Sequence, residues 1–169
     1  MAQRYLIALG SNKRHHRHGA PERVLGAALT ALAGEGVRIE SSSPVLQSAP
    51  LGPSKRRYAN SATVIETQLE PEELLALLQR IERDFGRRSG GQRWSSRVLD
   101  LDIVLWSGGA WSSPNLTVPH ASFRSRDFVL SPARQIAPGW RDPITRLSAK
   151  HLHARLTRPR RLPRGGHPW

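Results

Sequence analysis

The chain has no cysteine among its 169 residues, and it has no long apolar run. The absence of cysteine excludes disulfide bonds, thiolate zinc sites and a cysteine nucleophile, and it is compatible with a reducing compartment. No apolar run approaches the roughly 18 residues of a membrane span, and the N-terminal run that ends at Leu9 is too short for a signal peptide. We therefore expect a soluble, cytoplasmic protein that makes no membrane contact.

Acidic residues are scarce as well, with 13 aspartates and glutamates against 26 lysines and arginines, which gives a net charge of +13. Such an excess implies attraction to something anionic and raises nucleic acid as a partner. The basic residues, however, gather at residues 13–18, 55–57, 83–97 and 155–164. Three of these segments are predicted loops and the fourth is rich in proline and arginine. Charge alone therefore does not indicate a nucleic-acid function, and we expect no nucleic-acid partner.

The length suits one domain with a proper core and is too short for two ordinary domains. We predict a single domain over residues 1–150. Residues 151–169 are rich in arginine and proline, so we predict a poorly ordered basic tail there.

Strand and helix patterns alternate through the first 106 residues. Runs of β-forming or buried apolar residues predict strands at residues 4–9, 37–48, 58–67 and 99–106. Leucine-rich stripes at helical spacing predict helices over residues 21–33 and 70–85, and residues 122–138 are predicted to form a short helix and a loop. The order β-α-β-β-α-β is the split βαβ pattern. We therefore predict an α+β, ferredoxin-like sandwich with the helices packed on one face of an antiparallel sheet.

The most informative feature is a pair of aspartates inside an apolar run. In a strand, Asp100 and Asp102 share one face while Leu99, Leu101 and Ile103 share the other. Neighbouring carboxylates repel each other unless a cation lies between them, and Mg²⁺ binds through one or two carboxylates together with substrate phosphates. The pair therefore indicates a magnesium site, with a merely solvated strand face as the alternative.

An arginine-rich segment leads into this strand. Residues 83–97 hold five arginines, three glycines and one tryptophan against a single acid, which predicts a mobile loop. Guanidinium groups match phosphate oxygens in pairs of hydrogen bonds. Loop and strand together indicate a site where arginine and metal hold a polyphosphate from two sides, although a solvated surface loop would explain the arginines alone.

With these motifs in place, the chain resembles the 6-hydroxymethyl-7,8-dihydropterin pyrophosphokinase family of folate biosynthesis from about residue 4 to residue 138. The resemblance rests on residues 8–12 (ALGSN), 50–53 (PLGP), 58–60 (YAN), 97–103 (RVLDLDI) and 117–120 (TVPH). A single short motif of this kind is weak. The pattern R-x-L-D-L-D-I followed by V-P-H, in this order, is highly specific.

The resemblance implies transfer of the β,γ-diphosphate of ATP to the pterin hydroxymethyl oxygen, with release of AMP. It implies ATP as co-substrate and two Mg²⁺ ions held by Asp100 and Asp102, which agrees with the argument from the strand face. Because the metals would lower the pKa of the pterin hydroxyl, no protein base is assigned. We expect a monomer whose partners are ATP and the pterin.

The resemblance also implies site residues at matching positions. The catalytic positions are Arg87, Trp94, Arg97, Asp100 and Asp102. The ATP-binding positions are Glu82, Arg97, His120 and Arg126. The pterin-binding positions are Ser48, Leu51, Tyr58, Asn60 and Phe128. Several of these residues could instead be structural: Glu82 as an exposed helix carboxylate, Tyr58 and Phe128 as core, and His120 as a cap.

Two departures from the family pattern concern the arginine-rich loop. Ser89 stands where the family has a second loop arginine, although Arg88 is adjacent, and residues 95–96 are serines where the family has Gly-Pro. These departures bear on loop closure and nucleotide affinity rather than on the reaction. The three histidines of residues 13–18 suggest a metal site, but no carboxylate or cysteine accompanies them, so a solvated loop suffices.

Two other functions compete with the transferase. An RNA-binding module on the same fold would need stacking aromatics in an RNP-type run, which the sequence lacks, and the two aspartates would repel its ligand. An inactive relative kept for binding a partner is the other alternative. The intact carboxylates and arginines argue against it.

Overall fold

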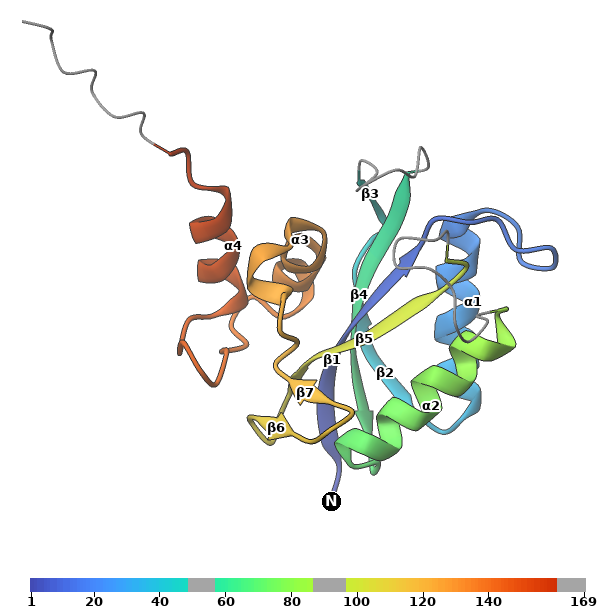
Figure 1. Ribbon diagram of the computed structural model, residues 1–169, viewed down its shortest axis with the longest axis horizontal. Helices are drawn as coiled ribbons and strands as arrows, with labels where there is room; N and C mark the ends of the chain where they lie inside the picture. The colour runs from blue at the N-terminus through green and yellow to red at the C-terminus, as the bar shows by residue number, and fades with distance from the viewer. Residues whose placement is uncertain (49–56, 87–96, 161–169) are drawn as a thin grey trace, which may run out of the picture.

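The computed structural model describes residues 1–48, 57–86 and 97–160. Its centre is an antiparallel sheet of β1 (Gln3–Ser11), β2 (Arg38–Ser42), β3 (Leu46–Ser48), β4 (Tyr58–Thr67) and β5 (Asp100–Trp106). The strand order is β2-β4-β1-β5, with β3 paired to β4 beyond the end of β2 (Figure 1). Each helix of the split βαβ pattern connects strands that are not neighbours. The predicted ferredoxin-like topology is therefore confirmed.

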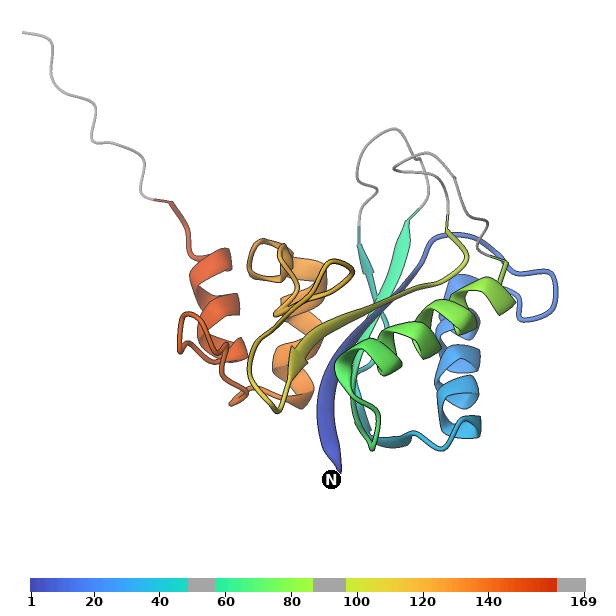
Figure 2. The ribbon, with the colours of Figure 1, turned by 60° about the horizontal axis from the view of Figure 1, so that its bottom comes forward.

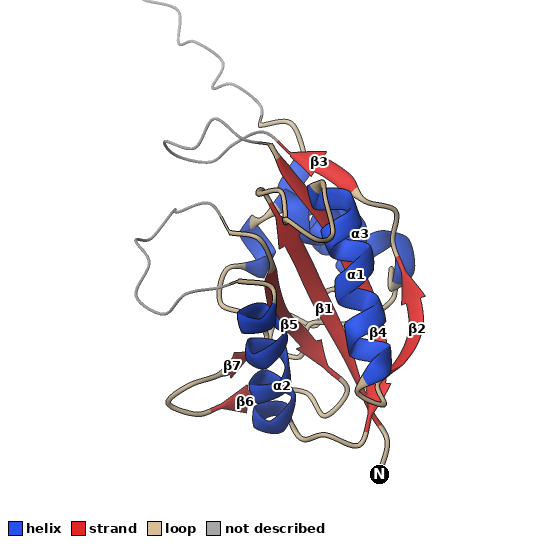
Figure 3. Ribbon diagram, turned by 90° about the vertical axis from the view of Figure 1, so that its right-hand side faces the viewer, coloured by secondary structure: helices blue, strands red, loops and turns tan. Residues whose placement is uncertain are grey.

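Two helices cover one face of the sheet, α1 (Pro21–Gly34) and α2 (Pro71–Asp84) (Figure 3). Each begins with proline at its first turn, and α2 adds a capping box in which Glu70 and Glu73 bind each other's backbone N–H groups. Their apolar stripes bury Leu25, Leu74 and Leu78 against the sheet. This layer is the main hydrophobic core.

The opposite face carries a second layer that the sequence did not predict as packed structure. It contains the 3-10 turn η1 (Phe123–Ser125) and the helices α3 (Asp127–Ile136) and α4 (Ala149–Thr157) (Figure 2). Their apolar side chains form a second core with strand residues: Leu6, Val64, Val104, Phe123, Leu130 and Leu152. The prediction of helices on one face therefore holds for α1 and α2, whereas α3 and α4 cover the other face.

Helix α4 corrects the prediction of a poorly ordered tail from residue 151. The hydroxyl of Ser148 caps the helix by accepting the backbone N–H of His151, and Ala149 and Leu152 are buried, the latter against the second core. Only a narrow stripe of the helix is apolar, and lysine, histidine and arginine supply four of its nine residues. The predicted boundary at residue 150 falls inside α4, and residues 161–169 lie outside the described residues.

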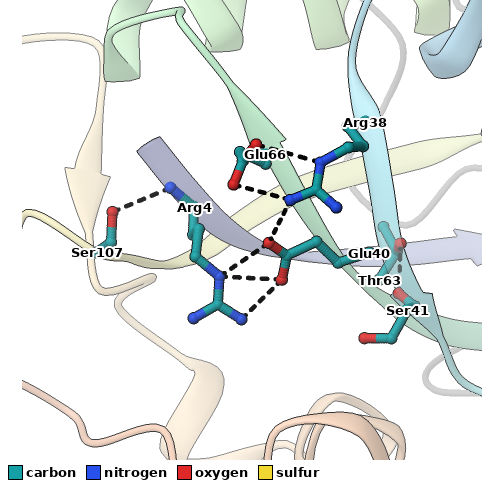
Figure 4. A network of polar contacts seen from close by, with 7 residues as sticks. All are labelled: Arg4, Arg38, Glu40, Ser41, Thr63, Glu66 and Ser107. Atoms are coloured by element: carbon teal, nitrogen blue, oxygen red, sulfur yellow. Dashed lines mark hydrogen bonds and ion pairs between the residues drawn. The ribbon is translucent and has the colours of Figure 1, made fainter. Parts of the chain in front are cut away.

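A network of ion pairs crosses the sheet near the start of β1 (Figure 4). Arg4 pairs with Glu40 at 2.7 Å, and Arg38 contacts both Glu40 at 3.2 Å and Glu66 at 2.9 Å. Arg4 also lies over the ring of Trp140, which precedes α4. The network therefore ties three strands to one another and to the second layer.

A short hairpin of β6 (Trp111–Ser112) and β7 (Thr117–Val118) follows β5 and leads to the cis Val118–Pro119 bond. Within the described part of the chain, every helix is too short or too polar to cross a bilayer.

Candidate active site

Asp100 and Asp102 lie on the sheet face opposite α1 and α2. Leu101 and Ile103, which alternate with them, are buried in the main core, as the strand period predicts. Both aspartates are half-buried. Across the sheet, Asp100 pairs with Gly10 and Asp102 pairs with Ala8 on β1. The two carboxylates thus stand side by side next to the smallest side chains of the central strand.

The electrostatics of Asp102 reflect this crowding. Its burial, and then the charge of Asp100, raise the pKa of Asp102, whereas His120, Arg126 and Arg97 lower it. The same three cationic or potentially cationic side chains therefore act on the acidic pair from different elements. The structure brings these five predicted site residues together around one point.

Arg97 is paired with Asp100 through its Nη1 at 2.9 Å from Oδ1. Burial disfavours the charged guanidinium, but Asp100, then Glu82 and Asp102, raise the pKa of Arg97 overall. The side chain is also 38% exposed, so its guanidinium is accessible from solvent while it is paired with Asp100.

Asn12 holds the backbone of Arg97. The backbone N–H of Arg97 donates to Asn12 Oδ1 at 2.7 Å, and the N–H of Asn12 donates to the Arg97 carbonyl at 3.1 Å. Asn12 is buried, and its Nδ2 has no hydrogen-bond partner in the described structure. Sequence analysis matched Asn12 to a family motif but did not single it out as a site residue.

Glu82 is buried on α2, not exposed on the helix surface. Its Oε1 accepts the backbone N–H of Leu101 at 2.8 Å. The alternative of an exposed helix carboxylate is therefore wrong.

His120 does have the capping contact that was one of its two possible roles. The ring Nδ1 of His120 accepts the backbone N–H of Ser122 at 3.2 Å. The backbone N–H of His120 donates to the carbonyl of Val104 on β5. Because Nδ1 is an acceptor, the neutral ring carries its proton on Nε2. A cap and a phosphate contact are thus compatible, since they use different nitrogens.

Three predicted pterin residues, Ser48, Tyr58 and Asn60, lie on β3 and β4, on the other side of β1 from the acidic pair. Asn60 on β4 is buried, and its Nδ2 donates to Ser48 Oγ on β3 at 2.8 Å. Ser48 also pairs in register with Tyr58. Phe128, at the start of α3, lies under the guanidinium of Arg126 at 5.7 Å. Leu51, Arg87 and Trp94 lie outside the described residues.

Gly10 separates the acidic pair from Asn60. It pairs with Asp100 on one side and with Asn60 on the other, and a Cβ at this position would lie 3.4 Å from Asn60 Oδ1 and 4.0 Å from Asp100 Cβ. Glycine inside a strand often marks a close approach, which is the signal that could have identified this position from the sequence.

The donor set fits magnesium but leaves most of its coordination to other ligands. Two carboxylates on one face are hard oxygen donors, and their mutual repulsion is what a divalent cation would relieve. Within the described ranges, no three His, Cys, Asp or Glu side chains form a metal-binding group. Phosphate oxygens and water would therefore have to complete the octahedron that Mg²⁺ requires.

The histidine-rich loop has a structural role in this conformation. His15 is buried, and its Nδ1 accepts the backbone N–H groups of Arg17 and His18. Burial, and then His16, lower the pKa of His15. The rings of His15 and His18 also contact Phe85 at the end of α2. These contacts explain the histidines as parts of a packed turn.

Comparison with known proteins decides the family. The family model described as 7,8-dihydro-6-hydroxymethylpterin-pyrophosphokinase (HPPK) matches residues 6–138. The chain belongs to the HPPK family. It is 39% identical over 145 residues to the 2-amino-4-hydroxy-6-hydroxymethyldihydropteridine pyrophosphokinase of Pseudomonas aeruginosa, covering 85% of this chain and 86% of that protein. It is 40% identical over 133 residues to the Haemophilus influenzae protein of the same name, covering 78% and 79%.

Solved HPPK structures share the fold. A crystal structure of HPPK-DHPS in complex with substrates superposes with a TM-score of 0.71 at 12% identity, covering 92% of this chain and 43% of that one. Wild-type Plasmodium falciparum HPPK-DHPS gives a TM-score of 0.69, also at 12% identity, covering 92% and 41%. This HPPK chain thus spans less than half of the solved chains, and at such identities the likeness concerns the fold alone.

Proposed function

We propose that this chain transfers the β,γ-diphosphate of ATP to the hydroxymethyl group of 6-hydroxymethyl-7,8-dihydropterin. The products are AMP and the pterin diphosphate, in the synthesis of tetrahydrofolate. Membership of the HPPK family supports the reaction. The observation that carries it is the arrangement of Asp100 and Asp102 beside Arg97 on one sheet face, with Asn60 one strand beyond Gly10.

Asp100 and Asp102 would hold the metal, which we propose to be two Mg²⁺ ions. When bound, magnesium neutralises phosphate charge, polarises the β-phosphorus and lowers the pKa of the attacking hydroxyl. The carboxylates fix the position of that charge. No side chain is assigned as general base, since the hydroxyl proton can leave to water once its pKa is lowered.

The cationic side chains would bind the phosphates. Arg97 exchanges its contact with Asp100 for phosphate oxygens, and His120 donates from Nε2. Arg126, which lies between η1 and α3 in the second layer, is near the acidic pair and would hold the far phosphate. Arg87 and Trp94 are proposed as catalytic-loop residues. The family resemblance assigns Glu82 to the nucleotide site.

The pterin would lie over β3 and β4. Asn60 offers both an amide donor and an amide acceptor to the pteridine edge, and its contact with Ser48 fixes the orientation of the amide. Tyr58 and Phe128 would pack against the ring faces, with Leu51 completing the lining. On this arrangement Gly10 lies between the two substrates.

We further propose that the enzyme is a monomer and works in the cytoplasm, where ATP is available and where a chain without cysteine is chemically suited. Light scattering coupled to gel filtration measures the oligomeric state directly.

The decisive assay mixes purified protein with Mg-ATP and 6-hydroxymethyl-7,8-dihydropterin and separates the nucleotides by chromatography. AMP that requires both pterin and magnesium establishes diphosphate transfer. ADP would instead mean transfer of a single phosphoryl group, and folded protein that yields no nucleotide product would contradict the proposal.

A further inference from the structure

Glu82 occupies an unusual place for a carboxylate. It lies on α2, only 3% exposed, among leucines and isoleucines of the main core. A buried carboxylate is costly unless it is hydrogen-bonded or paired. Helix α2 and the second layer, which contains Arg126 and Phe128, lie on opposite faces of the sheet, so Glu82 approaches β5 from the face away from the acidic pair.

The hydrogen bond from Leu101 gives this carboxylate a specific partner. Leu101 is the single residue between Asp100 and Asp102, and its N–H donates to Glu82 Oε1 at 2.8 Å. In the described sheet β5 is an edge strand, with β1 as its neighbour in the strand order. Glu82 therefore supplies the acceptor that a further strand would supply elsewhere in a sheet.

The backbone of the acidic run is thereby held at two points by buried side chains. Asn12 accepts the N–H of Arg97, and Glu82 accepts the N–H of Leu101. Asp100 lies between these two anchors, and Asp102 follows directly after the second. A metal site tolerates little movement of its ligands, so groups that fix the ligand backbone matter almost as much as the ligands.

We infer that Glu82 is a positioning residue for the acidic pair, acting through the backbone of Leu101, and not a residue that contacts the nucleotide. This inference rests on the proposed function for its kinetic readout. It also makes a claim about metal binding that does not require turnover. The contact with Leu101 needs an acceptor atom, so a neutral amide oxygen should keep most of this positioning.

The test compares Glu82→Gln and Glu82→Leu in the full-length chain. Glu82→Gln keeps the acceptor, and we expect its kcat to stay within about threefold of the wild type. Glu82→Leu removes the acceptor, and we expect kcat to fall by about 10- to 100-fold, as for other groups that orient metal ligands, with KM for ATP nearly unchanged. Glu72→Gln and Glu72→Leu are matched controls, because Glu72 lies exposed on the same helix, and they should leave both constants unchanged.

A second readout separates this inference from the proposed function. Mn²⁺ titration followed by electron paramagnetic resonance, with the ATP analogue that carries an α,β-methylene bridge, measures metal affinity without diphosphate transfer. We expect weakened Mn²⁺ binding in Glu82→Leu and near-normal binding in Glu82→Gln. If the wild type makes no AMP, the proposed function fails while the Mn²⁺ comparison still decides the role of Glu82.

Several results would overturn the inference. A rise in KM for ATP with unchanged kcat in both variants would indicate a nucleotide contact. Equal losses in Glu82→Gln and Glu82→Leu would indicate that the charge, not the acceptor, is needed. Wild-type behaviour of Glu82→Leu in both assays would show that the hydrogen bond has no role. If Glu82→Leu fails to fold, Glu82→Met takes its place in both assays, because its unbranched side chain fills similar space and its thioether is at most a weak acceptor for the Leu101 N–H.

Discussion

Asn12 and Arg97 bind each other through two backbone-directed hydrogen bonds, so the end of β1 is fixed to the residue that begins the acidic run. Loss of the Asn12 amide would leave the Arg97 N–H unpaired in a site where the asparagine is buried.

Replacement of Asn12 by alanine should therefore affect both stability and activity. We expect a loss of about 1–3 kcal/mol in the free energy of unfolding, the usual cost of an unsatisfied buried group. Turnover should fall further, because Arg97 and Asp100 lose one anchor. Urea unfolding and AMP production measure the two effects. Asn115→Ala, at an exposed position of the β6–β7 turn, should change neither, and an unchanged kcat in Asn12→Ala would contradict the positioning role.

Replacement of Asp102 by asparagine should separate function from stability. The neutral amide cannot replace the charged carboxylate as a magnesium ligand. A bound metal supplies several kcal/mol of transition-state stabilisation, so its loss should lower turnover by at least about a thousandfold. Burial and the charge of Asp100 both disfavour the carboxylate, so the variant should melt no lower than the wild type in EDTA. AMP assays and thermal melts measure this contrast.

The charge-matched control for that experiment is Asp84→Asn, since Asp84 is exposed near the end of α2. It should retain full activity. Normal AMP production by Asp102→Asn would exclude the metal assignment, and a strongly lowered melting temperature would mean that the carboxylate is structural.

A side chain at residue 10 should disturb the pterin side of the site. The added Cβ of Gly10→Ala would contact Asn60 Oδ1 at 3.4 Å, which is tolerable, whereas the two methyl groups of Gly10→Val extend further into the space between Asn60 and Asp100. We expect KM for the pterin to rise about threefold in Gly10→Ala and at least about tenfold in Gly10→Val, because each tenfold step needs only about 1.4 kcal/mol.

Gly26→Ala provides the comparison for residue 10, because a Cβ at that exposed helix position meets nothing within 4 Å. It should stabilise α1 slightly and leave pterin binding unchanged. Identical pterin KM values for Gly10→Val and the wild type would place the pterin elsewhere.

The stability of the second layer should depend on pH, because the carboxyl group of Asp142 must stay ionised to keep its contacts. This carboxylate is fully buried and accepts hydrogen bonds from Arg124, Thr145 and the N–H of Ile144. Burial alone would raise its pKa, but these contacts, led by Arg124, lower it from 3.8 to about 2. A lowered folded-state pKa means that this stabilisation is fully present above about pH 4 and is lost as the pH falls through about 2.

Thermal melts of the wild type and Asp142→Asn between pH 7 and pH 2 would measure that dependence. The wild type should lose more stability than the variant on going from pH 4 to pH 2. At pH 7, Arg124→Ala should destabilise the protein by about 3 kcal/mol, because it leaves a buried charge without its partner. Parallel pH profiles for the wild type and Asp142→Asn would contradict this role.

The acidic pair was predictable because it depends on local geometry. The two-residue period of a strand places Asp100 and Asp102 on one face whatever the rest of the fold does. The placement of Gly10 between Asp100 and Asn60 was not predictable. The register between strands about 50 residues apart is set by packing of whole faces, which no short segment contains.

Two features escaped sequence analysis for a related reason. The buried Ala149 and Leu152 of α4 form too narrow an apolar stripe to outweigh the arginines and prolines that follow the helix in the sequence. The role of Glu82 depends on a partner 19 residues away, and a carboxylate on an amphipathic helix is ordinarily exposed.

The ion-pair network at the start of β1 has a consequence at the other end of the same strand. Arg4 and Gly10 share one face of β1, so any slide of this strand along its neighbours would move both residues together. A slide of two residues keeps every side chain on its face and would bring Ala8 or Asn12 opposite Asp100 in place of Gly10. The same slide would take Arg4 away from Glu40 and Glu66. Exposed ion pairs add little to stability, but these pairs distinguish one alignment of the sheet from the next. The place of Gly10 between Asp100 and Asn60 depends on that alignment.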